Sequence, residues 1–343
     1  MICIYNIDKA KIWDGIVKSF LHFDVYYLSG YVKAFQIHGD GEPHLLYYES
    51  EGLKAIYVYM KRKTAIDGYF DSVSPYGYGG VLFEGNTSLD NLQIFWNEYV
   101  EKMEEQGIVD NFVRYHPILG NAEIMKHIAK VTDLGKTVSF DLSSPDIIWN
   151  NISSKTRNMI RKAEKNQIEI HHGKDFSFFE AFQRIYNTTM LNDHADNYYF
   201  FDDDYYKSIY KNLYDHYEMF YAVLSGEIIA VSIILYANEQ MHYHLSGSMI
   251  EYRNLAPNNL LLYRAALWGY EQGFKSFHMG GGIGSIEDNL YKFKAGFNRF
   301  SNCQFSIGKE IFDQDKYDEL VRKRKTIDSN FDESSPFFPL YRA

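Results

Sequence analysis

Cysteine, proline and long apolar runs are all scarce in this 343-residue sequence. The two cysteines, Cys3 and Cys303, are too few for a disulfide scaffold. Only 7 prolines accompany 46% hydrophobic residues, a composition that excludes a disordered or fibrous chain. The longest apolar stretch, Ile228 to Ala237, has half of the roughly 20 residues that a membrane-spanning helix needs. We therefore expect no membrane span, and the charged start of the sequence favours a cytoplasmic protein over a secreted one.

Basic residues are also in deficit. Thirty-five Lys and Arg face 45 Asp and Glu, which gives a net charge of −10. This balance excludes broad adhesion to DNA or to an acidic membrane surface. Any anionic ligand must therefore be bound by a local patch of positive charge.

The order of predicted elements repeats along the chain, and the length favours two domains. Each half contains neighbouring strands, an amphipathic helix ended by glycine, and a further strand. In the first half the ranges are 44–49, 53–60, 89–106 and 109–115; in the second they are 220–224, 228–236, 241–248, a helix from Pro257 to Gly273, and 275–279. The pattern predicts an α/β (α+β) protein with domains 1–145 and 146–343, the C-terminal tail packing back on the body.

One segment is strongly basic. Five basic residues and one acidic residue lie between positions 155 and 165. On a helix, Arg157, Arg161 and Lys165 would project along one face and could bind phosphate groups. A solvated surface helix is the alternative interpretation.

The strand 241–248 has a polar alternation. Period-two geometry predicts that His242, His244, Ser246 and Ser248 share one face. No Cys or carboxylate at ligand spacing completes a metal site nearby, so we expect no metal. The polar face either lines one side of a substrate-binding site or is a set of ordinary hydrogen-bonded side chains.

A glycine turn follows the strand 275–279. Gly280, Gly281 and Gly282 permit close approach of the backbone to a ligand, although they could also form only a tight turn. The segment fits neither the Rossmann nor the P-loop fingerprint. Cys303 has no histidine close in sequence, which favours a buried thiol over a nucleophile.

Five segments in order carry a resemblance to a known family. They are Ser74-Pro-Tyr-Gly-Tyr-Gly-Gly80, the basic helix 157–165, the turn 280–282, Tyr291-Lys-Phe-Lys-Ala-Gly-Phe297, and Phe338-Pro-Leu-Tyr-Arg342. Together they resemble the Fem family (FemAB-like) of peptidoglycan-bridge aminoacyltransferases, which are built from two acetyltransferase-like (GNAT) domains. The interval 176–217 is too short and too aromatic for the coiled-coil arm of many members, so the resemblance is to the arm-less type.

The resemblance implies two tandem GNAT-like domains with mixed central sheets, and an N-acyltransferase or aminoacyltransferase activity. In such a site Lys294 would stabilise the oxyanion of acyl transfer, with Phe293 as a packing or stacking partner of the donor. Alternatively, Lys292 and Lys294 are surface charges. The donor would contact the start of the helix after strand 241–248 and the glycine turn, and the acceptor would contact hydroxyls and aromatic faces. The donor residues are Arg253, Asn258, Asn259, Gly280, Gly281 and Gly282; the acceptor residues are Tyr76, Tyr78, Tyr198, Tyr199, His244 and Ser246.

The expected substrates follow from the same resemblance. No cofactor is tightly bound, and the acyl donor is either acyl-CoA or aminoacyl-tRNA. The acceptor is a small-molecule or lipid-linked glycan or peptidoglycan precursor. The alternative function is a non-catalytic protein that binds an envelope precursor and retains the tandem fold.

Overall fold

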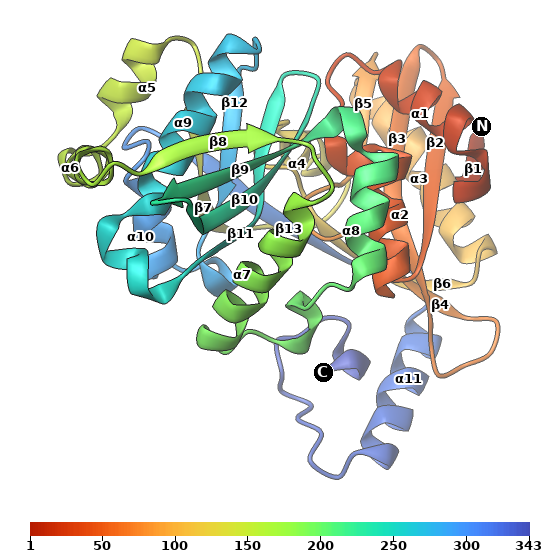
Figure 1. Ribbon diagram of the computed structural model, residues 1–343. Coiled ribbons are helices and arrows are strands. Elements are labelled where there is room, and N and C mark those ends of the chain that lie inside the picture. The colour runs from red at the N-terminus through yellow and green to blue at the C-terminus, as the bar shows by residue number, and fades with distance from the viewer. The chain divides into compact units, whose positions relative to one another are not determined.

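The computed structural model describes residues 1–343, which form two compact units (Figure 1). The first unit contains residues 1–134 and 305–343, and the second contains residues 135–304. This division differs from the predicted boundary near residue 145. Strand β7 (Val131–Asp141) pairs with β12 (Ser276–Gly280), and residues after 304 pack with the first unit. The extent of the two domains as independent folding units remains a prediction.

The first unit has a mixed sheet in the order β1-β2-β3-β4-β6-β13, with β5 paired to β3. Only the β4–β6 pair is parallel. The strands are β1 (Ile2–Asn6), β2 (Glu42–Ser50), β3 (Leu53–Lys63), β4 (Phe70–Val73), β5 (Leu82–Gly85), β6 (Ile108–Arg114) and β13 (Cys303–Ile311). The helices are α1 (Ala10–Lys18), α2 (Ser29–His38), α3 (Leu89–Glu105), α4 (Asn121–Met125) and α11 (Gln314–Ile327).

The second unit has a mixed sheet in the order β7-β12-β11-β10-β9-β8. Here only the β11–β12 pair is parallel. The remaining strands are β8 (Glu169–Gly173), β9 (Tyr217–Leu224), β10 (Glu227–Ala237) and β11 (Gln240–Ser248). The helices are α5 (Pro145–Asn151), α6 (Ser154–Lys165), α7 (Phe178–Asn192), α8 (Asp203–Asn212), α9 (Pro257–Glu271) and α10 (Asn289–Ala295).

The predicted repeat of elements is present in both units. In the first, the antiparallel strands β2, β3 and β4 are followed by α3 and then by β6, which is parallel to β4. In the second, β9, β10 and β11 are followed by α9 and then by β12, which is parallel to β11. The predicted α/β class with mixed sheets is therefore confirmed. The interval 176–217 forms α7 and α8, of 15 and 10 residues, in place of a coiled-coil arm.

Helices cover both faces of the second unit's sheet. Helix α9 buries Leu260 and Leu261 against Phe220 and Met241 of the sheet, and α6 packs against α9. Helix α7 packs on β10 and β11 from the other side, where Figure 1 shows it in front of the strands. A Cβ at Gly247 would lie 2.8 Å from the Tyr186 Cα, so glycine lets α7 approach β11 closely.

The first unit buries a polar network in an aromatic core. Asn111 accepts a hydrogen bond from Tyr57 Oη at 2.8 Å and donates one to Glu310 Oε2 at 2.9 Å. Burial raises the pKa of Glu310 to about 7. The network joins β3, β6 and β13 through partners that are far apart in sequence.

The C-terminal tail packs on the first unit. Tyr341 is 8% exposed and donates a 2.6 Å hydrogen bond to Asp110, and Arg342 pairs with Asp71. Phe338 stacks on Tyr317 of α11 with ring centroids 5.9 Å apart. The tail aromatics thus anchor this end of the chain. No helix in either unit has both the length and the apolar character that crossing a bilayer requires.

Candidate active site

Lys294 is a buried cation in the second unit. Its residue is 8% exposed, and its Nζ donates a 2.7 Å hydrogen bond to the carbonyl oxygen of Gly281. An ammonium has three N–H donors, so two remain for a ligand. Burial lowers the pKa of Lys294 to about 8, although the charge of Asp288 opposes the shift. Lys292 is exposed, because two residues of helix separate it from Lys294 by about 200°.

The glycine turn places its backbone beside this ammonium. Gly280 has a φ of +75°, which favours glycine. A Cβ at Gly281 would lie 3.0 Å from the carbonyl oxygen of Lys136, so the turn passes close to β7. The glycine turn and Lys294, which were predicted for separate roles, are in direct contact in the structure.

Strands β11 and β12 separate before they end. They are paired from Gln240 and Ser276 to His242 and His278, whereas β11 continues to Ser248. Their carboxyl ends lie at the same edge of the sheet because the strands are parallel. The segment leading to α9 follows β11, and the glycine turn follows β12, so both sets of predicted donor residues emerge at that edge.

A β-bulge at His244 changes which side chains of β11 share a face. Ile233 pairs with Leu245 and Ile234 with Tyr243, so His244 is the extra residue. Beyond it the alternation shifts by one position. The prediction that His242, His244, Ser246 and Ser248 share one face is therefore wrong, since Ser246 lies on the face of Tyr243.

His244 contacts a helix on the α7 side. Its Nε2 lies 2.8 Å from the hydroxyl of Tyr205 in α8, and Tyr205 stacks on Phe201 at 4.2 Å between centroids. Burial lowers the pKa of His244 to about 3, and His242 adds to the shift. The imidazole is therefore neutral near pH 7 and can exchange a hydrogen bond with Tyr205.

The start of α9 offers backbone N–H groups. Its cap residue, Ala256, has a φ of +61° and provides no side-chain cap. The Oδ1 of Asn258 is buried without a hydrogen-bond partner, and Arg253 lies 3.5 Å from Asp193. Uncapped N–H groups at a helix start can hold phosphate groups of a donor.

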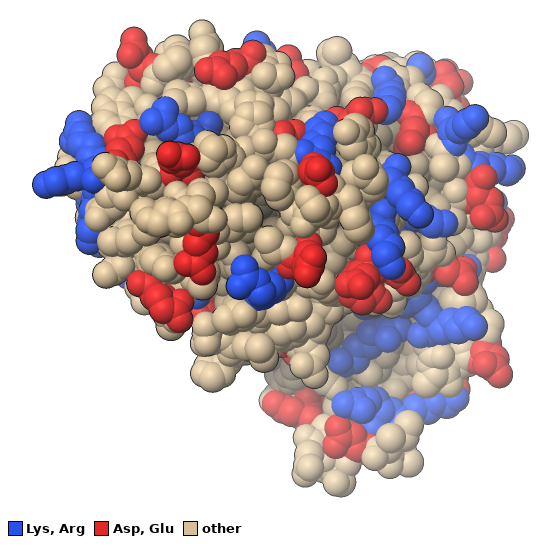
Figure 2. Space-filling model, in the orientation of Figure 1, with Lys and Arg blue, Asp and Glu red and all other residues tan.

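The predicted basic stripe is present on α6 and rests on an aromatic side chain. The guanidinium groups of Arg157 and Arg161 lie 5.9 and 5.2 Å from the ring centroid of Trp149. Arg157 also donates to the Trp149 carbonyl, which fixes its position. Figure 2 shows Lys and Arg gathered at the left edge, where α6 lies in Figure 1, and Lys165 is exposed there.

The start of α6 is joined to the end of α10. The backbone N–H of Ser153 donates to the Gly296 carbonyl at 2.8 Å. A Cβ at Gly296 would overlap the Thr156 hydroxyl, so glycine is needed for this contact. Phe293 packs against the core and meets Phe297 at 5.3 Å. The basic helix and the Lys294 helix are thus packed together.

The tyrosines predicted to bind the acceptor lie in separate parts of the chain. Tyr198 and Tyr199 form an edge-to-face pair at 5.5 Å in a short helical turn (Asn197–Tyr199) of the second unit. In the first unit, Tyr76 stacks on Phe35 at 5.4 Å and Tyr78 packs edge-on to His116 at 6.0 Å.

The loop that carries Tyr76 and Tyr78 is held from both sides. Arg114 donates to the carbonyls of Ser74 and Pro75, and Asn121 donates to Gly79 at 2.8 Å. Gly80 has a φ of +89°. The loop therefore presents its rings in fixed positions.

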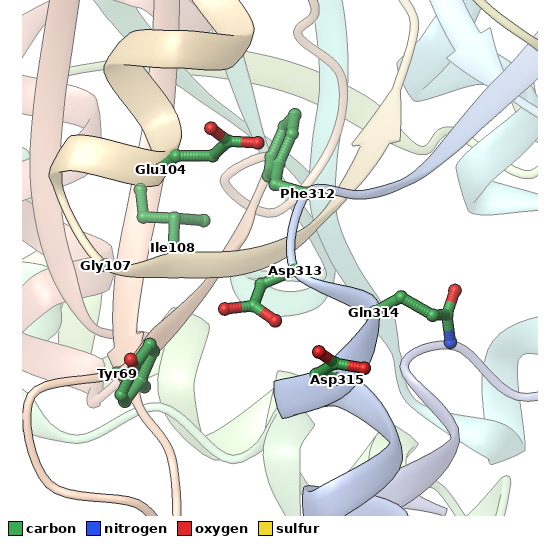
Figure 3. Close-up of a pocket in the computed structure, with 8 residues that line it drawn as sticks. All are labelled: Tyr69, Glu104, Gly107, Ile108, Phe312, Asp313, Gln314 and Asp315. Carbon is green, nitrogen blue, oxygen red and sulfur yellow. The ribbon is translucent and has the colours of Figure 1, made fainter.

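A surface cavity of about 370 Å³ lies in the first unit (Figure 3). Its lining comes from the end of α3, the start of β6, the start of α11 with the two residues before it, and the chain near Tyr69. The lining residues are Tyr69, Glu104, Gly107, Ile108, Phe312, Asp313, Gln314 and Asp315. None of them is a predicted site residue, so this cavity is distinct from the Lys294 site.

Three contributors to the site were not predicted from the sequence. Trp149 supports the basic stripe, Tyr205 bonds to His244, and Asp288 caps α10. Only Asp288 has a local signal, because an aspartate directly before a helical segment is a typical N-cap. The other two depend on tertiary contacts.

Residues 151–293 match the family described as "Acetyltransferase (GNAT) domain". No curated protein sequence matches the chain. The match covers the second unit's helices α6 to α9 and its strands β8 to β12, and it ends one residue before Lys294. The second unit is therefore similar to GNAT acetyltransferase domains along most of its length.

Solved structures share the fold along nearly the whole chain. FemX is 14% identical, with a TM-score of 0.70 over 92% of this chain and 99% of its own. The C-terminal domain of a proposed lysylphosphatidylglycerol synthetase from Agrobacterium fabrum is 12% identical, with a TM-score of 0.56 over 96% and 98%. L-PGS from Bacillus licheniformis is 13% identical, with a TM-score of 0.56 over 88% and 92%. The resemblance to Fem-like tandem GNAT proteins is confirmed at the level of the fold.

Proposed function

We propose that this protein transfers an acyl or aminoacyl group to an amine of a cell-envelope glycan or peptidoglycan precursor. The observation that carries the proposal is the buried Lys294 ammonium, which has N–H groups to spare beside the glycine turn. The GNAT domain match and the shared fold with FemX support the reaction class. Another neighbour is named for lysylphosphatidylglycerol, an aminoacylated envelope lipid.

The reaction needs a positive charge where negative charge develops. The acceptor amine attacks the carbonyl carbon of the donor, which is a thioester or an RNA ester. The carbonyl oxygen of the donor then becomes an oxyanion. Collapse of this intermediate breaks the bond to the CoA sulfur or to the ribose oxygen, and the amine proton leaves with that group. Lys294 would hold the oxyanion and Phe293 would support the donor side of the site.

The acyl donor and the acceptor would bind to different parts of the chain. The start of α9, with Arg253, Asn258 and Asn259, and the turn Gly280 to Gly282 would bind the phosphates and acyl chain of acyl-CoA, or the end of a charged tRNA. Arg157, Arg161 and Lys165 would bind phosphate on the donor or on a nucleotide-linked acceptor. The acceptor would meet Tyr198, Tyr199 and His244 of the second unit, whose hydroxyls and rings suit a sugar or a peptide.

The experiment is product detection by mass spectrometry. The purified protein is incubated with acetyl-CoA or charged tRNAs and with nucleotide-linked amino sugars or muropeptide precursors, beside a Lys294→Met control. A mass increase of the acceptor that depends on Lys294 supports the proposal. Tight binding of a precursor without any transfer from either donor would instead favour the non-catalytic binding protein.

A further inference from the structure

The carboxylate of Asp288 bonds to two different segments of the second unit. One oxygen accepts a 2.8 Å hydrogen bond from the backbone N–H of Tyr291, in the first turn of α10. The other accepts a 3.1 Å hydrogen bond from the N–H of Ile283, which follows the glycine turn. One side chain therefore fixes the turn that contains Gly281 relative to the helix that contains Lys294.

The turn is built closely around this carboxylate. A Cβ at Gly282 would lie 2.5 Å from Asp288 Oδ1 and would overlap the Ile286 carbonyl oxygen. Gly282 therefore has to be glycine for the carboxylate to reach Ile283. The geometry of the turn and the position of Asp288 depend on each other.

Asp288 is also the charge that acts on Lys294. Its hydrogen bonds to the backbone keep the pKa of Asp288 below its usual value, and Lys294 contributes to this shift. Of the other charged side chains nearby, Lys292 and Glu287 are exposed, and the Nζ of Lys136 on β7 bonds to Asn302. Asp288 is the anion whose charge raises the pKa of Lys294 against the effect of burial.

We propose that Asp288 is the positioning residue of the Lys294 site: it ties the glycine turn to α10 and so holds the ammonium against Gly281. The proposal rests on the proposed function for its catalytic meaning, but its geometric part does not need a substrate. Asp288 touches no reacting atom and acts through Lys294.

Two substitutions separate the effect of the N-cap hydrogen bond of Asp288 from the effect of its negative charge. Asp288→Asn removes the anion, and its one amide oxygen can still accept the cap bond from Tyr291, whereas the bond from Ile283 is lost because the amide nitrogen cannot accept. The pKa of Lys294 should then fall further, because the charge that opposes the effect of burial is gone. Asp288→Ala removes both bonds, which releases the turn and lets the ammonium reach water. Its pKa should then return toward the ordinary lysine value.

The test measures Lys294 directly in the free protein. Trace labelling with acetic anhydride from pH 6 to 11, read at Lys294 by peptide mass spectrometry, gives the pH midpoint of its reactivity. The matched control is Asp313→Asn, which changes the N-cap of α11, where Asp313 accepts from Lys316 at 2.9 Å. Circular dichroism and Tm confirm that each variant folds.

We expect the midpoint to fall in Asp288→Asn, to rise in Asp288→Ala and to stay in place in Asp313→Asn. A midpoint unchanged in both Asp288 variants would overturn the proposal, as would a shift of the same size in the control. Turnover is the second readout: kcat should fall at least tenfold in Asp288→Ala, with KM changed less. Shifted labelling in a protein with no transfer activity would refute the proposed function and leave the positioning role intact.

Discussion

Lys294 Nζ donates to the carbonyl oxygen of Gly281 at 2.7 Å, so a buried cation is held by the backbone of the turn that precedes its own helix. This contact joins two segments for which the sequence left alternatives open. The glycine turn could have been only a tight turn, and Lys294 could have been a surface charge. The contact removes the surface interpretation for Lys294, whereas Lys292 remains a surface charge.

Lys294→Met should slow transfer by roughly 10² to 10³ in kcat, because one donor to the oxyanion is lost. Methionine keeps the length and removes the charge, so folding and substrate binding should change little. Lys292→Met is the matched control on the exposed side of α10 and should keep full activity. Steady-state kinetics with a verified donor and acceptor measure both, and full turnover by Lys294→Met would exclude the oxyanion role.

Arg157→Ala combined with Arg161→Ala should weaken the binding of phosphate-bearing donors or acceptors. Both guanidinium groups are held over Trp149 and so lose little freedom when a phosphate binds. Lys162→Ala, an exposed change on the same helix, is the control for net charge. Isothermal titration calorimetry gives the affinities. Equal affinity in the double variant and the wild type would make the stripe an ordinary solvated face.

Gly296→Ala should destabilise the protein by about 1 to 3 kcal/mol, because the new methyl group overlaps the Thr156 hydroxyl where α6 meets α10. Gly15→Ala in α1 is the matched control. Nothing lies within 4 Å of a Cβ there, and alanine favours the helix by about 0.5 to 1 kcal/mol. Urea unfolding compares the two. A Gly296→Ala protein as stable as the wild type would show that the contact between α6 and α10 adjusts freely.

Stability should depend on pH through Glu310. Its pKa is about 7 in the folded state and close to 4.5 when unfolded, so the folded state binds more protons between these values. Its contribution to stability is therefore complete below about pH 4.5 and is lost as the pH rises through 7. The slope from this group is at most about 1.4 kcal/mol per pH unit.

Glu310→Gln mimics the protonated carboxyl and should flatten that part of the profile. Unfolding free energies from urea titrations at pH 5, 6, 7 and 8 would show the difference from the wild type. Parallel profiles for the two proteins would mean that Glu310 does not take up a proton in this range. Glu49→Gln, at an exposed position of β2, is the surface control.

The fold was predictable where local signals are strong. Gly107 and Gly273 each lie two residues past the end of a predicted helix, α3 and α9, and Pro257 lies at the start of α9, as the sequence predicts. Helices α7 and α8 were not assigned, because their aromatic residues suit strands as well as helices until the sheet they cover is known. The bulge at His244 has no local sequence signal, and it reversed the face of Ser246.

The candidate site was predictable in its residue types more than in its contacts. The glycine turn was evident in the sequence and the role of Lys294 followed from the family resemblance, but their direct hydrogen bond depends on Asp288 and on the packing of Gly296 against α6. Trp149 was missed because a single tryptophan in a short helix carries no periodic pattern. Its role exists only when α5 and α6 are packed together.

The first unit is built from two separate stretches of the chain, 1–134 and 305–343, so its two parts are synthesised at different times. Its sheet includes β13, and Glu310 on that strand bonds to Asn111, which emerges from the ribosome some two hundred residues earlier. The second unit is one continuous stretch, 135–304. The second unit can therefore complete its sheet while β1 to β6 still await β13, and during that interval the unpaired edge of β6 is open to pairing with a wrong strand.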